Sequence, residues 1–215
     1  MSEESIVQNS LGSAADELAK EVFVVKSNLD IFELISANAT ALKEGRKFFG
    51  HLQQQSHALV VLGLSKIYER PTKHSLASIS GVCALLDPES ECDPTAHRKL
   101  CKEYEVEQSG NWHDDLRKIR RTIGRAFSKD IARLRRVRNL RIAHLVLAPV
   151  NLDLPGIARS EMLLRFAIDI HSFIAASFLN TIPHPTATDI QVKASLAKVL
   201  GATGIKNVQN KVSDI

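Results

Sequence analysis

Apolar residues recur at every third or fourth position through most of this chain, and that spacing predicts amphipathic helices. A strand would need apolar side chains at every second position, and no segment shows that pattern. The longest stripe lies between residues 116 and 145 and includes one arginine; its members are Leu116, Ile119, Ile123, Phe127, Ile131, Leu134, Val137, Arg138, Ile142 and Leu145. Pro149 ends this segment. Gly124 or Ser128 can divide it into two helices, with Ser128 as the N-cap of the second.

Four further stretches carry helical stripes or helix start signals. A first helix is expected after Ser13, with a stripe formed by Leu18, Val22, Val25, Leu29, Phe32 and Ile35. A second is expected over 41–69, with Phe48, Leu52, Leu59, Leu62 and Ile67 on its apolar face. Asp93 and Pro94 are an N-cap and a favoured first residue, and they predict a helix over 94–107. The last long helix should cover 160–180, with a stripe formed by Leu163, Phe166, Ile170, Phe173, Ile174 and Phe178. Shorter helices are expected over 75–86 and 189–200.

These elements predict an all-α protein, built as an antiparallel up-and-down helical bundle with extra short helices. We expect a flexible N-terminus over 1–13, a helical domain over 14–182 and a C-terminal extension with a short helix over 183–215.

Composition places the chain among ordinary globular proteins, with 44% apolar and 24% charged residues in 215. Its three cysteines, Cys83, Cys92 and Cys101, are odd in number and lack a Cys-x-x-Cys pair, which favours a reducing compartment. The first 13 residues have no apolar core, so they do not resemble a signal peptide. The longest clean apolar run, Ala58 to Leu64, is too short to span a bilayer. We therefore expect a cytoplasmic protein without a membrane partner.

Charge is distributed very unevenly. Residues 116–145 hold eleven Arg and Lys against one Asp, a net charge of +10, whereas the whole chain carries +4. Nine of the eleven cations are Arg, which binds phosphate in a bidentate manner. This asymmetry favours an anionic partner, with RNA as the main candidate. The predicted RNA-binding residues are Arg125, Lys129, Arg133, Arg135, Arg136 and Arg141. The alternative is a solvated helix face without a ligand.

Arg138, Asn139 and His144 form the candidate catalytic set. An imidazole suits proton transfer near neutral pH, and a guanidinium can stabilise charge that develops on a phosphate. Cleavage of RNA by its own 2′-hydroxyl needs these two functions, so neither metal nor cofactor is required. The alternatives are a packing role for His144 and a structural role for Arg138 as a clamp on a carboxylate such as Asp169.

The segment Arg138-Asn139-Leu140-Arg141-Ile142-Ala143-His144 resembles the Arg-x(4–6)-His signature of the HEPN superfamily, and in particular its AbiU-like branch, named for phage abortive infection. Residues 47–50, Lys-Phe-Phe-Gly, and 65–70, Ser-Lys-Ile-Tyr-Glu-Arg, resemble the second helix of that branch. The resemblance covers residues 15–180. It implies an up-and-down bundle that forms a twofold dimer, with the motif helix near the dimer seam.

Two hypotheses follow from different classes. The first is a metal-independent endoribonuclease of the HEPN type, acting as a homodimer in phage defence or with an antitoxin. The second is a non-catalytic HEPN-like module that binds RNA, a nucleotide or a protein partner. Cys92, His97 and Cys101 resemble a set of metal ligands, but no fourth ligand is obvious and the spacing matches no familiar zinc module, so we predict no metal site.

Overall fold

The computed structural model describes residues 3–40, 42, 45–70, 78–139, 155–179, 181 and 198, and most of these residues are helical. Within those residues there is no strand, and the protein is all-α as predicted. The elements are α1 (Glu3–Ala37), α2 (Arg46–Ile67), α3 (Ile79–Cys83), α4 (Pro94–Glu103), α5 (Trp112–Ala126), α6 (Ser128–Arg138), α7 (Ile157–Ile174) and the π-helical turn η2 (Ala175–Leu179).

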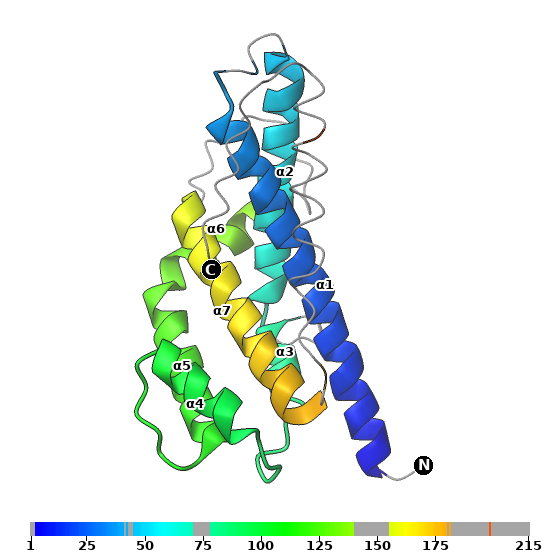
Figure 1. The fold of residues 1–215 in the computed structure, drawn as a ribbon, viewed down its shortest axis with the longest axis vertical. Coiled ribbons are helices and arrows are strands. Elements are labelled where there is room, and N and C mark those ends of the chain that lie inside the picture. The colour runs from blue at the N-terminus through cyan, green and yellow to red at the C-terminus, as the bar shows by residue number, and fades with distance from the viewer. Residues whose placement is uncertain are drawn as a thin grey trace.

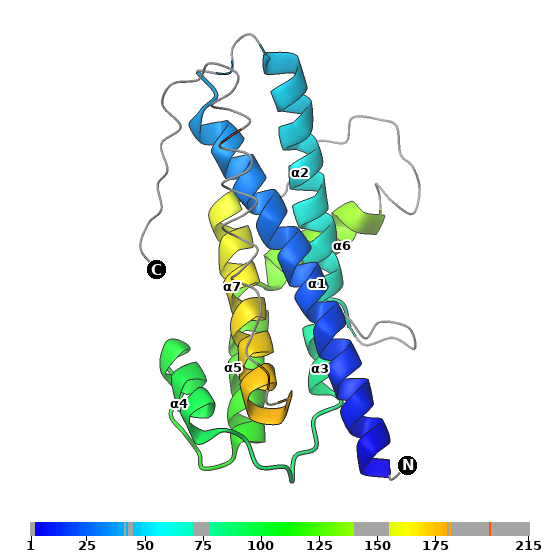
Figure 2. The same cartoon turned by 45° about the vertical axis from the view of Figure 1, so that its right-hand side comes forward.

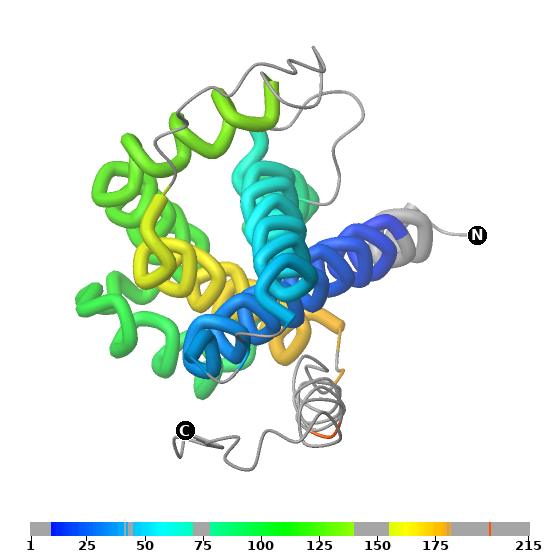
Figure 3. The backbone as a smooth tube through the Cα atoms, turned by 90° about the horizontal axis from the view of Figure 1, so that it is seen from above, coloured from blue at the N-terminus to red at the C-terminus, as the bar shows by residue number. Residues whose placement is uncertain are grey.

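The two longest helices, α1 and α2, form an antiparallel pair, and α7 packs beside α1 antiparallel to it (Figure 1). The helices α4 and α5 lie on the far side of α7 from this pair (Figure 1), and in the turned view α5 runs behind α7 (Figure 2). Seen from above, α6 lies across the bundle rather than along it (Figure 3), and it packs against α2. The up-and-down arrangement therefore holds for α1, α2 and α7, while α6 crosses them.

One apolar core joins these helices. The predicted stripe of α1 is buried in this core at Leu18, Val22, Val25 and Leu29, whereas Ile35 is buried in a small second cluster with Leu42. The stripe of α7 is buried in the main core at Leu163, Phe166, Ile170, Phe173 and Ile174. The basic segment contributes Leu116, Ile119, Phe127, Leu134 and Val137 to the same core. Its helices are therefore held by one buried stripe, which leaves their cations on the outer face.

The predicted stripe of α2 was wrong at two positions. Phe48 and Leu59 remain 67% and 43% exposed. The buried face instead includes small and polar positions that a hydrophobicity pattern overlooks; its members are Ser56, Val60, Val61, Gly63, Leu64, Ser65 and Ile67. Small residues on this face allow α1 to approach α2 closely.

Several helix boundaries differ from the expected ones. The first helix begins at Glu3, so Ser13 lies inside it and is not its N-cap. The helix expected over 75–86 is the five-residue α3. The basic segment divides at Phe127, which is the N-cap residue of α6, so Ser128 is the first helical residue rather than the cap.

The N-caps of α4 and α5 are formed by side chains that accept hydrogen bonds from the first turn of each helix. Asp93 accepts hydrogen bonds from the backbone N–H groups of Thr95 and Ala96, and Pro94 begins α4. Asn111 caps α5 in the same way, and Asp114 and Asp115 occupy the first turn of α5, near its positive end.

Two expectations concern parts of the chain outside the described residues. These are the short helix over 189–200 and the C-terminal extension over 183–215. Within both ranges only Lys198 is described. The boundaries of the helical domain at 14 and 182 stay predictions.

The segment Ile157–Leu179, which is α7 with η2, is long and apolar enough to cross a membrane by composition. Half of its most apolar window is buried inside the bundle, where α7 packs against α1, α2 and α4. This is the pattern of a helix whose apolar side chains form a protein core.

His171 on α7 makes the stability of this core sensitive to acid. The side chain is buried, and its Nδ1 has no hydrogen-bond partner among the described residues. Burial lowers the pKa of His171, while Asp16 on α1 opposes that shift. Because the unfolded chain takes up this proton more readily, stability should fall as the pH drops through about 6.5 towards the lower folded value.

We therefore expect His171→Leu to lose less unfolding free energy than the wild type between pH 7 and pH 5. Urea unfolding at a series of pH values measures this. Parallel pH profiles for the two proteins would contradict it.

Candidate functional site

The C-terminal ends of α2 and α6 meet at the candidate catalytic arginine. Nη1 of Arg138 donates to Oε1 of Glu69 at 2.6 Å, and both side chains are just over one quarter exposed. Nε and Nη2 of Arg138 donate to Oδ1 of Asn139 at 3.3 and 3.2 Å. The guanidinium is thus held from two sides by residues on different elements, and part of it still faces solvent.

A second arginine fixes the same junction one turn earlier on α6. Nη2 of Arg135 donates to the backbone carbonyl of Tyr68 at 2.8 Å, and the Tyr68 hydroxyl donates to the carbonyl of Leu163 on α7 at 2.6 Å. Burial raises the pKa of Tyr68 well above its usual value, so the phenol stays protonated and remains a donor. Burial, and then repulsion from Arg70 and Arg138, lower the pKa of Arg135.

The start of α6 is anchored to α7. Asp130, in the first turn of α6, is buried and accepts from Arg159 at 2.7 Å. The Arg159 guanidinium also lies 4.0 Å from the centre of the Phe127 ring. The single acid of the basic segment therefore serves the fold, and among the described residues most cations of α5 and α6 form no ion pair with a carboxylate.

The predicted RNA-binding residues fall into three groups. Arg125, Lys129 and Arg136 are exposed. Arg133 is half-buried, with its Nη1 3.8 Å from Asp130, and Arg135 is bound to the Tyr68 carbonyl. Arg141 and His144 lie outside the described residues, so the distance from the imidazole to Arg138 stays a prediction.

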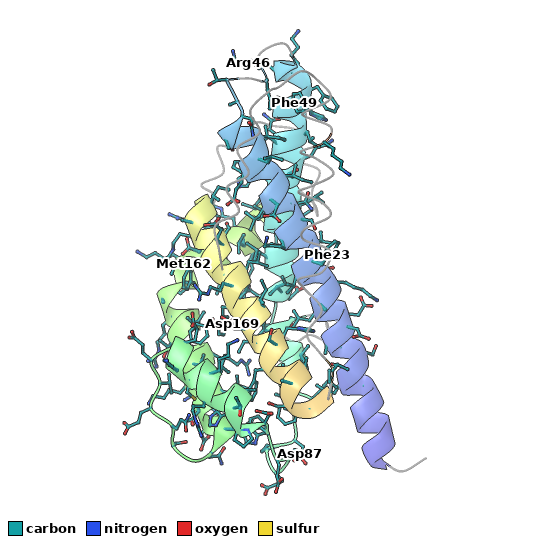
Figure 4. The ribbon with its side chains drawn as sticks, in the orientation of Figure 1. Phe23, Arg46, Phe49, Asp87, Met162 and Asp169 are labelled. Carbon is teal, nitrogen blue, oxygen red and sulfur yellow. The ribbon has the colours of Figure 1, made fainter. Side chains whose placement is uncertain are left out.

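The hypothesis that Arg138 clamps a carboxylate named Asp169 as an example, and this residue is not the partner of Arg138. Oδ2 of Asp169 accepts from the Tyr104 hydroxyl at 2.7 Å. Figure 4 shows Asp169 on the side of α7 that faces α4. Burial raises the pKa of this carboxyl, and the Tyr104 hydrogen bond opposes the rise. The carboxylate that binds Arg138 is Glu69, and helical spacing does not single out this residue.

Glu69 and Arg70 are the site residues that pattern analysis missed. Both belong to the Ser-Lys-Ile-Tyr-Glu-Arg segment at residues 65–70, whose resemblance to the AbiU-like branch was the available signal. Glu69 and Arg138 are far apart in sequence, and only tertiary packing brings them together. The spacing of residues within one helix cannot predict such a contact.

The fold also gathers His97, Cys101 and Asp115, whose potential ligand atoms lie within 4.8 Å of one another. Asp115, in the first turn of α5, is buried and accepts from the Ser109 backbone N–H. Its Oδ2 lies 3.1 Å from Nε2 of His97. These contacts tie the 104–111 loop to α4 and α5, and they satisfy the buried carboxylate without an ion.

Taken together, the fold and the site define an all-α helical domain whose Arg-rich helices carry an Arg–Asn pair at their C-terminal end. A family model for AbiU2, a branch of the HEPN domains, matches residues 9–189. The chain belongs to this HEPN AbiU2 family. No curated protein and no solved structure matches the chain.

Proposed function

We propose that this protein is a metal-independent endoribonuclease of the HEPN type. Arg138, Asn139 and His144 act in a cleft shared by the two subunits of a homodimer. The proposed setting is the cytoplasm, in phage defence or in a pair with an antitoxin. Membership of the HEPN AbiU2 family supports this proposal, because the matched residues include the whole Arg138-to-His144 segment.

The observation that carries the proposal is the environment of Arg138. Its guanidinium is oriented by Glu69 and Asn139, is partly exposed, and lies on a helix that is rich in cations. A phosphate that approaches α6 would meet a positioned donor rather than a flexible side chain. Arg125, Lys129, Arg133, Arg136 and Arg141 supply the surrounding positive charge that attracts the RNA backbone.

In the proposed reaction, one His144 imidazole accepts the proton of the ribose 2′-hydroxyl. The 2′-oxygen forms a bond to phosphorus while the bond from phosphorus to the 5′-oxygen breaks. His144 of the partner subunit, as imidazolium, donates a proton to that leaving oxygen. Arg138 neutralises the charge of the phosphorane, and Asn139 orients the guanidinium. The products are a 2′,3′-cyclic phosphate and a 5′-hydroxyl.

A direct test incubates the purified full chain with single-stranded RNA in the presence of EDTA. We expect the wild type to cleave the RNA. The rate of His144→Ala should be lower by a factor of about 100 or more, because proton transfer by a positioned side chain contributes at least about that factor. His51→Ala is the matched control, because His51 is an exposed histidine on α2 that pairs with Gln55. Unchanged cleavage by His144→Ala would refute the catalytic assignment.

The second candidate function is a non-catalytic module that binds RNA, a nucleotide or a protein partner. The 2.6 Å ion pair between Arg138 and Glu69 favours it, since an arginine held by a carboxylate can serve structure alone. This alternative predicts salt-dependent RNA binding without any turnover. RNA binding that does not change with salt would count against it.

A further inference from the structure

A cavity of about 610 Å3 lies between the C-terminal end of α2, α3, α5 and α6. Five arginines line it: Arg70, Arg117, Arg120, Arg121 and Arg135. Only Arg135 belongs to the RNA-binding set predicted above, so the fold brings together a group that the sequence pattern does not reveal.

Positive charge in this cavity is not balanced by its own walls. Among the described residues that line it there is no Asp or Glu. Arg117 lies 3.5 Å from the exposed Asp114, and the neighbouring Glu69 is bound to Arg138. Arg70 and Arg121 make no ion pair with any described residue. Guanidiniums collected in this way repel one another, and a bound anion would relieve that repulsion.

Two of the guanidiniums are held in place by neutral groups. Nη2 of Arg120 donates to Oγ of Ser80 at 3.3 Å, and Nη2 of Arg135 donates to the Tyr68 carbonyl at 2.8 Å. Each guanidinium has five N–H donors, so most donors remain available for a ligand. Neutral partners fix the geometry of these arginines without cancelling their charge, which is a preorganised arrangement for an anion.

The size and charge of the cavity select the class of ligand. Its volume is in the range of small-molecule sites. A phosphodiester carries one negative charge and would leave most of five guanidiniums unneutralised, whereas a chain of phosphates carries several. Ile123 and Ile131 are only half-buried and form an apolar part of the wall, against which an uncharged group can pack.

We propose that this cavity binds a nucleoside polyphosphate, with the phosphate chain among the five arginines and the nucleoside towards the apolar wall. The same chemistry occurs in a free nucleotide and in the 5′-triphosphate end of an RNA. Arg138 does not line this cavity, and nucleotide binding is measured without RNA cleavage.

Isothermal titration of the full chain with ATP, ADP and AMP in EDTA tests the proposal. Affinity should fall at least tenfold from ATP to AMP. The exposed pair Arg70→Gln/Arg121→Gln should weaken ATP binding at least tenfold. The matched control is Arg98→Gln/Lys118→Gln, which removes the same charge from exposed positions on α4 and α5 outside the cavity and should change affinity less than twofold.

RNA oligonucleotides of one sequence with a 5′-triphosphate or a 5′-hydroxyl distinguish the two sources. Preference for the triphosphate end over ATP assigns the site to RNA termini, and the reverse assigns it to free nucleotides. Equal loss of ATP binding in the cavity pair and the control pair would overturn the proposal, as would equal affinity for ATP and AMP or no binding of any probe. His144→Ala should bind ATP like the wild type, which separates this result from the cleavage assay.

Discussion

Arg138→Lys is expected to cleave RNA about 100-fold more slowly than the wild type and to unfold with nearly the same free energy. Lysine keeps the positive charge and can still pair with Glu69, but it lacks the planar fork that contacts Glu69 and Asn139 together. Loss of one positioned donor to a developing oxyanion costs about 100-fold or more in rate. The ion pair is partly exposed, so its contribution to stability is about 1 kcal/mol or less. Single-turnover cleavage and urea unfolding measure the two quantities.

Arg165→Lys is the matched control for this prediction. Arg165 on α7 pairs with Glu103 on α4 at 2.5 Å, so the same substitution is made in the same kind of pair away from the candidate site. Its cleavage rate should equal that of the wild type.

Glu69→Gln separates the catalytic hypothesis from the clamp hypothesis. If Arg138 only holds α6 to α2, then Arg138→Lys and Glu69→Gln should lose equal stability, and cleavage should fall only as the folded fraction falls. If Arg138 acts on phosphate, Arg138→Lys should lose more rate than Glu69→Gln, whose amide oxygen still accepts a hydrogen bond from Arg138, and this loss should appear when both proteins are fully folded. Equal rates for Arg138→Lys and the wild type would contradict the catalytic role.

Sequence patterns predicted those parts of the fold that depend on one helix at a time. The stripes of α1 and α7 were correct except at the half-buried Phe32 and Phe178, because large apolar side chains at helical spacing report burial directly. The α2 stripe failed because its buried face includes Ser56 and Gly63, which no hydrophobicity pattern selects.

The candidate site shows the same division. Arg138 and Asn139 could be chosen from a local motif, whereas Glu69 and Arg70 could not, because only tertiary packing brings the end of α2 to α6. Asp115 lies in the first turn of α5, and its buried contact with His97 on α4 is likewise a product of tertiary packing. Charge asymmetry predicted an anionic partner, and the helix packing decided which arginines share one cavity.

Gly63 is the position where α1 and α2 approach most closely among the described glycines. A Cβ added there would meet Cγ2 of Val25, a side chain that is fully buried on α1. The methyl group of a β-branched residue cannot rotate away inside a packed core, so one of the two helices would have to move.

We therefore expect Gly63→Ala to lower the free energy of unfolding by about 1–2 kcal/mol, the cost of overpacking less the gain in helix propensity. Gly50→Ala, in the same helix, meets nothing within 4 Å and should raise the free energy by about 0.5–1 kcal/mol. Urea unfolding of both variants measures the two opposite signs. Val25→Ala removes the obstructing methyl group, so the Gly63→Ala/Val25→Ala protein should lose less than the two single variants combined. Two results would contradict this close packing of α1 against α2 at Gly63. One is a double variant whose loss of unfolding free energy equals the sum of the two single losses. The other is a Gly63→Ala protein that is as stable as Gly50→Ala.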